Sequence, residues 1–287
     1  EISGADWRRK WQERLDQLAL PLAVWLAHQR RDRYWKHGSV NEDYAAIQCP
    51  VFATGGWMDG YSNAIPRLLA HLRVPRLGLI GAWGHKYGHQ AVPGPAMGYL
   101  QECLRWWDHW LKGQHTGIMQ EPMLRAFMQE EVPPRGDYPV CPGRWVAEPV
   151  WPPRAAVRRR LHLNAGSALR GRAGRAETLV HRSEQTIGVA GGEWCPHGIG
   201  GYGPQCPTDQ REDDVRSLVF DTEPLRRPLE ILGQPAVTLT LAVDKPVAFV
   251  AVRLNDVFPD GRVSRVTFGV LNPTHRRSHE LPEPMPV

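Results

Sequence analysis

The beginning of the chain carries large apolar side chains at helical spacing. Between Ala5 and Tyr34 these positions recur at steps of three and four residues, the period of an amphipathic helix. Pro21 lies inside this stretch, and proline in a helix interior removes a hydrogen bond and clashes with the preceding turn. We therefore predict two helices that meet near Pro21. Their apolar positions are Trp7, Trp11, Leu15, Leu18, Leu22, Trp25 and Leu26.

The next part alternates buried strands with helices. Residues 49–55 (CPVFATG) and 77–82 (LGLIGA) are short apolar runs of the kind found in strands that are covered on both faces. The residues between them predict a helix over 62–72, and a strand, helix and buried strand in this order form a βαβ unit with parallel strands. Residues 96–112 predict a further helix that ends at Gly113.

After Pro122 the hydrophobic period changes from that of a helix to that of a strand. Residues 133–175 are rich in Pro, Gly and Arg and predict a connection with short strands at 144–146 and 158–163. Short strands at regular spacing, with no helix between them, are typical of a sandwich or jelly roll. The fold class is thus α/β followed by all-β. The further strands are expected at 217–220, 236–243, 247–257 and 262–270, with a hairpin turn at Asp260-Gly261.

Composition narrows the classes of partner. The 287 residues hold 35 Lys and Arg against 30 Asp and Glu, a net charge of +5. The basic clusters are scattered and lie in no nucleic-acid-binding motif, so we expect no nucleic-acid partner. No apolar run reaches the roughly 18 to 20 residues of a membrane helix, so we expect no membrane partner. The odd, irregularly spaced 5 cysteines favour the cytoplasm, although a leader or preceding domain before Glu1 stays open.

Two residues stand where catalytic groups of a parallel sheet are expected, after the carboxyl ends of the strands. Asp59 follows the first buried strand in GGWMDGY, and His85 follows the second in GAWGHKYGH. A carboxylate that holds an imidazole in one tautomer, with the imidazole as general base, is the Asp and His part of a nucleophilic triad. In α/β-hydrolases the acid precedes the histidine, as here. A turn role for Asp59 and a structural role for His85 are the alternatives.

Neighbouring side chains suggest a pocket more than a metal site. Four aromatic residues flank Asp59 and His85 and could line an acyl or aromatic pocket, although core packing explains each of them equally well. These are Trp57, Tyr61, Trp83 and Tyr87. Cys195, His197 and Cys206 offer three zinc ligands, but their spacing matches no common zinc site. We predict no metal and no other cofactor.

Five strings of the chain resemble the cocaine esterase and X-Pro dipeptidyl-peptidase family of serine hydrolases. They are GGWMDGYSNA, LIGAWGH, ECLRWWDHWLKG, TGIMQEP and LNDVFPDGRV, in this order. The resemblance extends from near Trp7 to Arg277. It implies an α/β-hydrolase domain with a helical cap, a C-terminal jelly roll of the galactose-binding-like type, and acyl-enzyme cleavage of a small ester, amide or X-Pro peptide. It gives the acid to Asp59 and the histidine to His85, with Ala82 where proline is usual.

The nucleophile of that family is missing from the chain. It is a serine in a G-x-S-x-G elbow, and this string occurs nowhere in the sequence. Ser167, in AGSAL, lies downstream of His85 and has neither the elbow nor the order. We expect a fragment that is inactive alone, comprising the end of the cap and the C-terminal part of the hydrolase domain (1–130), a linker with the first short strands (131–175) and an incomplete β-sandwich (176–287).

Three functions therefore stay open. The first is a serine hydrolase in which Asp59 orients His85 and the serine lies outside these residues. The second is a catalytically inactive hydrolase-like protein whose β-sandwich serves as a binding module. The third is a basic interaction protein, which a steep salt dependence of nucleic-acid binding would reveal. Homo-oligomer formation is left open by the sequence.

Overall fold

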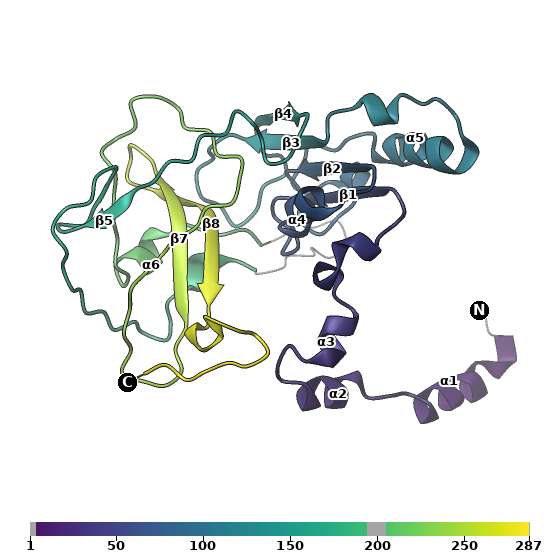
Figure 1. Cartoon of the computed structure of the whole chain (residues 1–287), viewed down its shortest axis with the longest axis horizontal. Helices are drawn as coiled ribbons and strands as arrows, with labels where there is room; N and C mark the ends of the chain where they lie inside the picture. The colour runs from purple at the N-terminus through teal and green to yellow at the C-terminus, as the bar shows by residue number, and fades with distance from the viewer. Residues whose placement is uncertain (1–3, 194–204, 287) are drawn as a thin grey trace. The chain divides into compact units, whose positions relative to one another are not determined.

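The computed structural model describes residues 4–193 and 205–286 (Figure 1). Its contacts divide the chain into two compact units. The first comprises Glu1–Glu42, Leu239–Ala251 and Val270–Val287, and the second comprises Asp43–Thr238 and Val252–Gly269.

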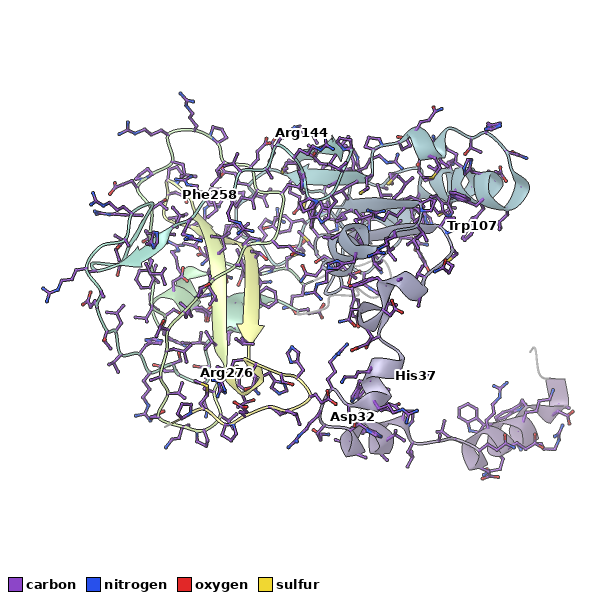
Figure 2. The ribbon with its side chains drawn as sticks, viewed as in Figure 1. Asp32, His37, Trp107, Arg144, Phe258 and Arg276 are labelled. Carbon is purple, nitrogen blue, oxygen red and sulfur yellow. The ribbon has the colours of Figure 1, made fainter. Side chains whose placement is uncertain are left out.

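Three short helices open the first unit. They are α1 (Trp7–Asp16), α2 (Pro21–Ala27) and α3 (Arg33–His37). Pro21 is the first residue of α2, where its missing N–H costs nothing, and the predicted break there is confirmed. Asp32, labelled in Figure 2, caps α3 by accepting a hydrogen bond from the backbone N–H of Tyr34. The apolar side chains of α1 and α2 are exposed, Trp7 to 54% and Leu22 to 63%.

The centre of the second unit is a four-stranded mixed sheet with the strand order β1-β2-β3-β4. Its strands are β1 (Val51–Gly56), β2 (Arg76–Gly81), β3 (Leu124–Gln129) and β4 (Gly143–Glu148). The first three strands are parallel, and β4 pairs antiparallel with β3. Helix α4 (Ala64–His71) connects β1 to β2, which confirms the βαβ unit. Helix α5 (Tyr99–Lys112) precedes β3 and ends at the left-handed Gly113.

Two helices cover different side chains of this sheet. Ile65 and Leu69 of α4 pack with Ala53, Ile80 and Leu124 in one buried cluster. Trp106 of α5 packs with Leu77 and Ile118 in another, and Phe52 joins it. Because side chains alternate along a strand, Leu77 and Ile80 of β2 lie on opposite faces, so both faces of the sheet are covered. Each fully buried aliphatic side chain contributes about 1.5–3 kcal/mol to folding.

Smaller antiparallel sheets follow in sequence. The strands β5 (His162–Asn164) and β6 (Ala168–Arg170) form one pair, and β7 (Val250–Val257) and β8 (Val263–Leu271) form another. The hairpin turn predicted at Asp260-Gly261 is present: the N–H of Phe258 donates to the carbonyl of Arg262 at 2.9 Å. Helix α6 (Arg211–Asp214) lies between the two pairs in sequence.

The strands expected at 217–220 and 236–243 are not strands in the structure. Leu239 and Leu241 alternate as in a strand, but both are exposed, at 40% and 38%, and no described strand pairs with them. An alternating pattern forms a strand only where a neighbour supplies hydrogen-bond partners. The described residues therefore contain small antiparallel sheets, and the jelly roll stays a prediction.

No helix in the described part of the chain has the length and apolar character to cross a bilayer.

Short 3-10 helices complete the described secondary structure. The 3-10 helices are Gly4–Asp6, Val40–Glu42, Tyr44–Ala46, Gly88–Gln90, Ile118–Gln120, Val189–Gly191 and Pro273–His275.

Candidate active site

Asp59 lies in a tight turn directly after β1. Its N–H donates to the carbonyl of Gly56 at 3.2 Å, and its own carbonyl accepts from the N–H of Ser62 at 3.1 Å. The carboxylate oxygen Oδ1 accepts from the N–H of Tyr61 at 2.9 Å. The side chain is only 12% exposed. The turn therefore fixes the carboxylate through one oxygen and leaves Oδ2 for another partner.

That partner is His85, which follows β2. Its Nδ1 lies 2.9 Å from Oδ2 of Asp59, and its side chain is 44% exposed. With Nδ1–H donated to the carboxylate, the basic nitrogen is Nε2, which in a triad takes the proton of the nucleophile. The structure thus brings the two predicted residues into contact across 26 positions of sequence. Their catalytic role stays a prediction.

The two loops are joined by backbone hydrogen bonds that extend beyond the strands. The N–H of Trp57 donates to the carbonyl of Gly81 at 2.9 Å, and the N–H of Met58 donates to that of Trp83 at 3.2 Å. A Cβ atom at Gly56 would lie 1.8 Å from the Trp83 carbonyl oxygen. Glycine is therefore required for this approach, and the Gly-Gly pair that ends β1 is the sequence signal for it.

The four flanking aromatic residues have different environments. Trp83 is 1% exposed and packs in the interior. The indole N–H of Trp57 donates to the carbonyl of Phe127 at 2.7 Å, which fixes this ring against β3. Tyr61 is 59% exposed, and its ring centre lies 5.8 Å from that of His85 in an edge arrangement. Tyr87 is 63% exposed and stacks on Tyr99. The ring of Tyr61 therefore lies against that of His85.

Two neighbours of the site were not singled out from the sequence. Met58, directly before Asp59, accepts a hydrogen bond from the thiol of Cys206, with the two sulfur atoms 3.5 Å apart. Burial raises the pKa of the Cys206 thiol to about 12. The hydroxyl of Tyr99 on α5 lies 3.2 Å from Oγ1 of Thr54 in β1, and burial raises the pKa of this phenol. No sequence pattern predicts either contact, because each joins segments that are distant in the chain.

The remaining predicted groups lie elsewhere or cannot be placed. Ser167 is in the turn between β5 and β6, outside the β1–β4 sheet, with φ at +58°. Cys195 and His197 of the cysteine and histidine cluster lie outside the described residues. Within residues 4–193 and 205–286, no group of three or more His, Cys, Asp or Glu side chains is arranged to hold a metal ion.

Two family models match the chain. The model described as X-Pro dipeptidyl-peptidase (S15 family) matches residues 4–87. The model described as X-Pro dipeptidyl-peptidase C-terminal non-catalytic domain matches residues 116–286, which is more than half of the chain. Asp59 and His85 fall within the first match.

Alignments with known proteins cover most of this chain but less than half of the length of those proteins. Candidate serine esterases of Mycobacterium bovis and Mycobacterium tuberculosis are each 32% identical over 300 residues, which cover 99% of this chain and 44% of theirs. The cocaine esterase of a Rhodococcus species is 24% identical over 88% of this chain and 46% of its own. The chain therefore spans less than half the length of these relatives. A crystal structure of a CocE/NonD family hydrolase from Staphylococcus aureus aligns over 54% of this chain and 26% of that chain, at 13% identity and a TM-score of 0.41.

Proposed function

Since the chain belongs to the X-Pro dipeptidyl-peptidase (S15) family, we propose that it supplies the acid and the base of a serine hydrolase. The observation that carries the proposal is the 2.9 Å contact between Nδ1 of His85 and Oδ2 of Asp59. This contact orients the imidazole and stabilises the imidazolium that forms during catalysis.

The proposed reaction is acyl transfer through a covalent intermediate. Nε2 of His85 removes the proton of a serine hydroxyl as its oxygen attacks the substrate carbonyl, and then gives that proton to the leaving group. Water, activated by the same nitrogen, hydrolyses the acyl-enzyme. Asp59 stays ionised throughout. The serine and the oxyanion donors are proposed to lie outside these residues, because the sequence contains no G-x-S-x-G.

The proposed substrates are small carboxylic esters. The names of the relatives support an ester, since they describe serine esterases and a cocaine esterase. The half-exposed ring of Tyr61 beside His85 suits an apolar acyl group. Amides and X-Pro peptides are the other substrates that the family name suggests, and assays on matched ester, anilide and dipeptidyl substrates distinguish the three.

The proposal is tested by comparing the 287-residue chain with a protein that also contains the preceding segment. The longer protein should hydrolyse an aryl ester and be labelled by a serine-directed fluorophosphonate, and a chelator should leave this activity intact. The chain alone should do neither, and its unpaired sheet edge should make it prone to aggregate. Adding the segment as a co-expressed fragment should restore activity and solubility.

Two results would contradict the proposal. A purified 287-residue monomer that hydrolyses the ester, and loses this activity on Ser167→Ala, would show that the nucleophile is misplaced. A folded longer protein that the fluorophosphonate does not label would support the inactive, hydrolase-like alternative.

A further inference from the structure

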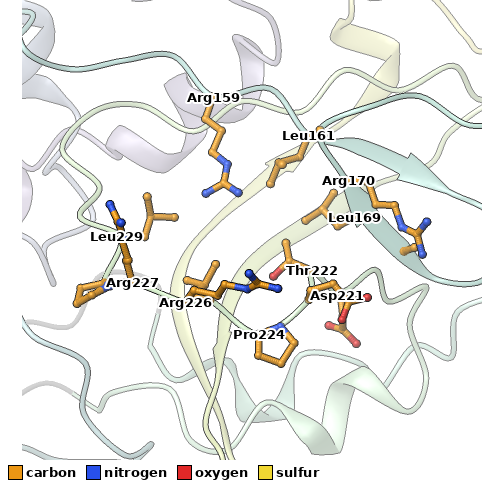
Figure 3. A pocket seen from close by; sticks show the side chains of 15 residues that line it. Arg159, Leu161, Leu169, Arg170, Asp221, Thr222, Pro224, Arg226, Arg227 and Leu229 are labelled. Carbon is orange, nitrogen blue, oxygen red and sulfur yellow. The ribbon is translucent and has the colours of Figure 1, made fainter.

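A hollow in the second unit is lined by four arginines. It measures about 750 Å³ and lies between β6, the segment before β5 and residues 221–229 (Figure 3). Arg159 and Arg226 reach toward it from different walls, while Arg170 and Arg227 lie at its margin (Figure 3). Within the described residues, none of the four forms an ion pair with a carboxylate within 4.0 Å.

The four arginines of the hollow differ in this respect from arginines elsewhere in the same unit, which have carboxylate partners. Arg105, Arg125 and Arg253 each contact a carboxylate at 2.5 to 2.9 Å. The lining also includes Asp221 and Glu223, so the hollow and its margin together hold four arginines against two carboxylates and have a net positive charge. An anion that entered would meet donors that no described carboxylate occupies.

The floor of the hollow is apolar and its backbone is fixed. Leu161, Leu169, Leu225 and Leu229 line it between the arginines. The N–H of Leu169 donates to the carbonyl of Asp221 at 2.7 Å, and the N–H of Asp221 donates to that of Ser167 at 2.8 Å. These two bonds tie the 221–229 segment to the β5–β6 hairpin.

The far end of that segment is held as well. Glu230, directly after Leu229, forms an ion pair with Arg144 of β4 at 2.6 Å. The segment that carries Arg226 and Arg227 is therefore attached at both ends before any ligand binds. A site whose groups are held in place loses less conformational freedom on binding than a mobile one.

From these features we propose that this arginine hollow binds a small organic anion with an apolar body. A guanidinium group matches a carboxylate or phosphate oxygen pair through two parallel hydrogen bonds. The leucines accept the apolar body, and the hollow has the size of sites for molecules of a few rings. Arg159 and Arg226 hold the anionic head, and Leu169 and Leu229 contact the body.

The test measures binding by calorimetry to the longer protein that also contains the preceding segment. Each organic probe carries the same naphthalene ring system. We expect 2-naphthoate and 2-naphthyl phosphate to bind with one site per chain, and comparison of the two shows which head group is preferred. 2-Naphthylmethylammonium has the same body with the opposite charge and should not bind. Inorganic phosphate, which lacks the body, should bind at least tenfold more weakly than naphthyl phosphate.

Paired variants locate the site. The double variant Arg159→Gln with Arg226→Gln should weaken naphthyl phosphate binding at least tenfold. The control Arg175→Gln with Arg182→Gln removes the same charge from exposed positions outside the hollow and should stay within twofold of wild type. Leu229→Gln should weaken naphthyl phosphate severalfold and leave the binding of inorganic phosphate unchanged. Equal unfolding midpoints show that the variants are folded.

Each contrary result has a defined meaning. Equal binding of the naphthyl cation, or loss of binding in the control pair as large as in the test pair, would overturn the proposal. So would unchanged binding in the Arg159 and Arg226 variant. Displacement of the probe by a single-stranded oligonucleotide, weakened equally by both variant pairs and steeply by salt, would indicate nonspecific polyanion binding instead.

Discussion

The amide of Met58, one residue before Asp59, donates its hydrogen to the carbonyl oxygen of Trp83, two residues before His85, at 3.2 Å. This bond joins the loops after β1 and β2 where the strand pairing has ended. The separation of Asp59 and His85 is therefore set by backbone geometry as well as by the hydrogen bond between their side chains. A group positioned by backbone hydrogen bonds needs little reorganisation during a reaction.

The first prediction concerns this junction. Gly56→Ala should destabilise the protein by about 1–3 kcal/mol or more, because the new methyl group would lie 1.8 Å from the Trp83 oxygen. Gly233→Ala is the matched control, since nothing lies within 4 Å of a Cβ atom there. Urea unfolding measures both. A Gly56→Ala midpoint equal to that of the control would show that the two loops are not held together as described.

The second prediction concerns Asp59 and His85 in the longer protein that also contains the preceding segment. His85→Ala should abolish ester turnover because it removes the base. Asp59→Asn should lower kcat by a factor on the order of 10⁴, because the imidazole then adopts the wrong tautomer. His115→Ala, an exposed histidine of the same unit, should change nothing. Turnover within tenfold of wild type in either test variant removes that residue from the mechanism.

The third prediction concerns acid stability. Burial alone would raise the pKa of Glu102, but Arg125 at 2.5 Å and Arg105 at 3.1 Å outweigh it and hold this pKa below its ordinary value. The ionised form is thus favoured in the folded state. Its stabilisation is present above the ordinary pKa of 4.5 and is lost as the pH falls through the lower folded value.

Glu102→Gln tests this linkage. It should lower the free energy of unfolding at pH 7 by about 1–3 kcal/mol, because two guanidinium groups lose a charged partner. It should also flatten the fall in stability below pH 4.5. Glu177→Gln, at an exposed position, is the control. Parallel pH profiles for Glu102→Gln and wild type would contradict the assignment.

The fourth prediction concerns alkaline stability. Burial raises the pKa of the Cys141 thiol from 9.0 to about 11, and the side chain is 2% exposed. Because the folded value is the higher one, the stabilisation is complete below pH 9 and is lost as the pH rises toward 11. The loss should reach at most about 3 kcal/mol.

Cys141→Ala should remove this part of the alkaline slope. Iodoacetamide at pH 8 should modify the exposed Cys49 rapidly and leave Cys141 intact until the protein unfolds. Mass spectrometry of the alkylated peptides measures the two rates. Equal rates for Cys49 and Cys141 in folded protein would show that the thiol is accessible and that its raised pKa is wrong.

The sequence predicted the α/β part well because its signals are local. The runs CPVFATG and LGLIGA are apolar on both faces, which is typical of parallel strands that are covered on both sides. The structure has β1 and β2 at these positions, with bounds that agree within two residues. The positions of Asp59 and His85 after these strands followed from the same reasoning. Their contact required only that two adjacent parallel strands end at one edge of the sheet.

The β-rich part was harder because pairing is not local. Residues 236–243 alternate in polarity, yet a strand exists only where another strand lies beside it. The arginine hollow shows the same limit. Arg159 belongs to a run that appeared in sequence as one of several scattered basic clusters. Its relation to Arg226, on a segment 67 positions away, depends on the contact between β6 and Asp221.

The free side of β1 determines where a strand added to the sheet in parallel would end. Strand β4 ends the sheet on one side, and β1 ends it on the other with no partner among the described residues beyond it. A strand added at the free side of β1 in the direction of β1 and β2 would finish at the edge that carries Asp59 and His85. A loop that follows an added parallel strand would thus share this edge with the proposed acid and base.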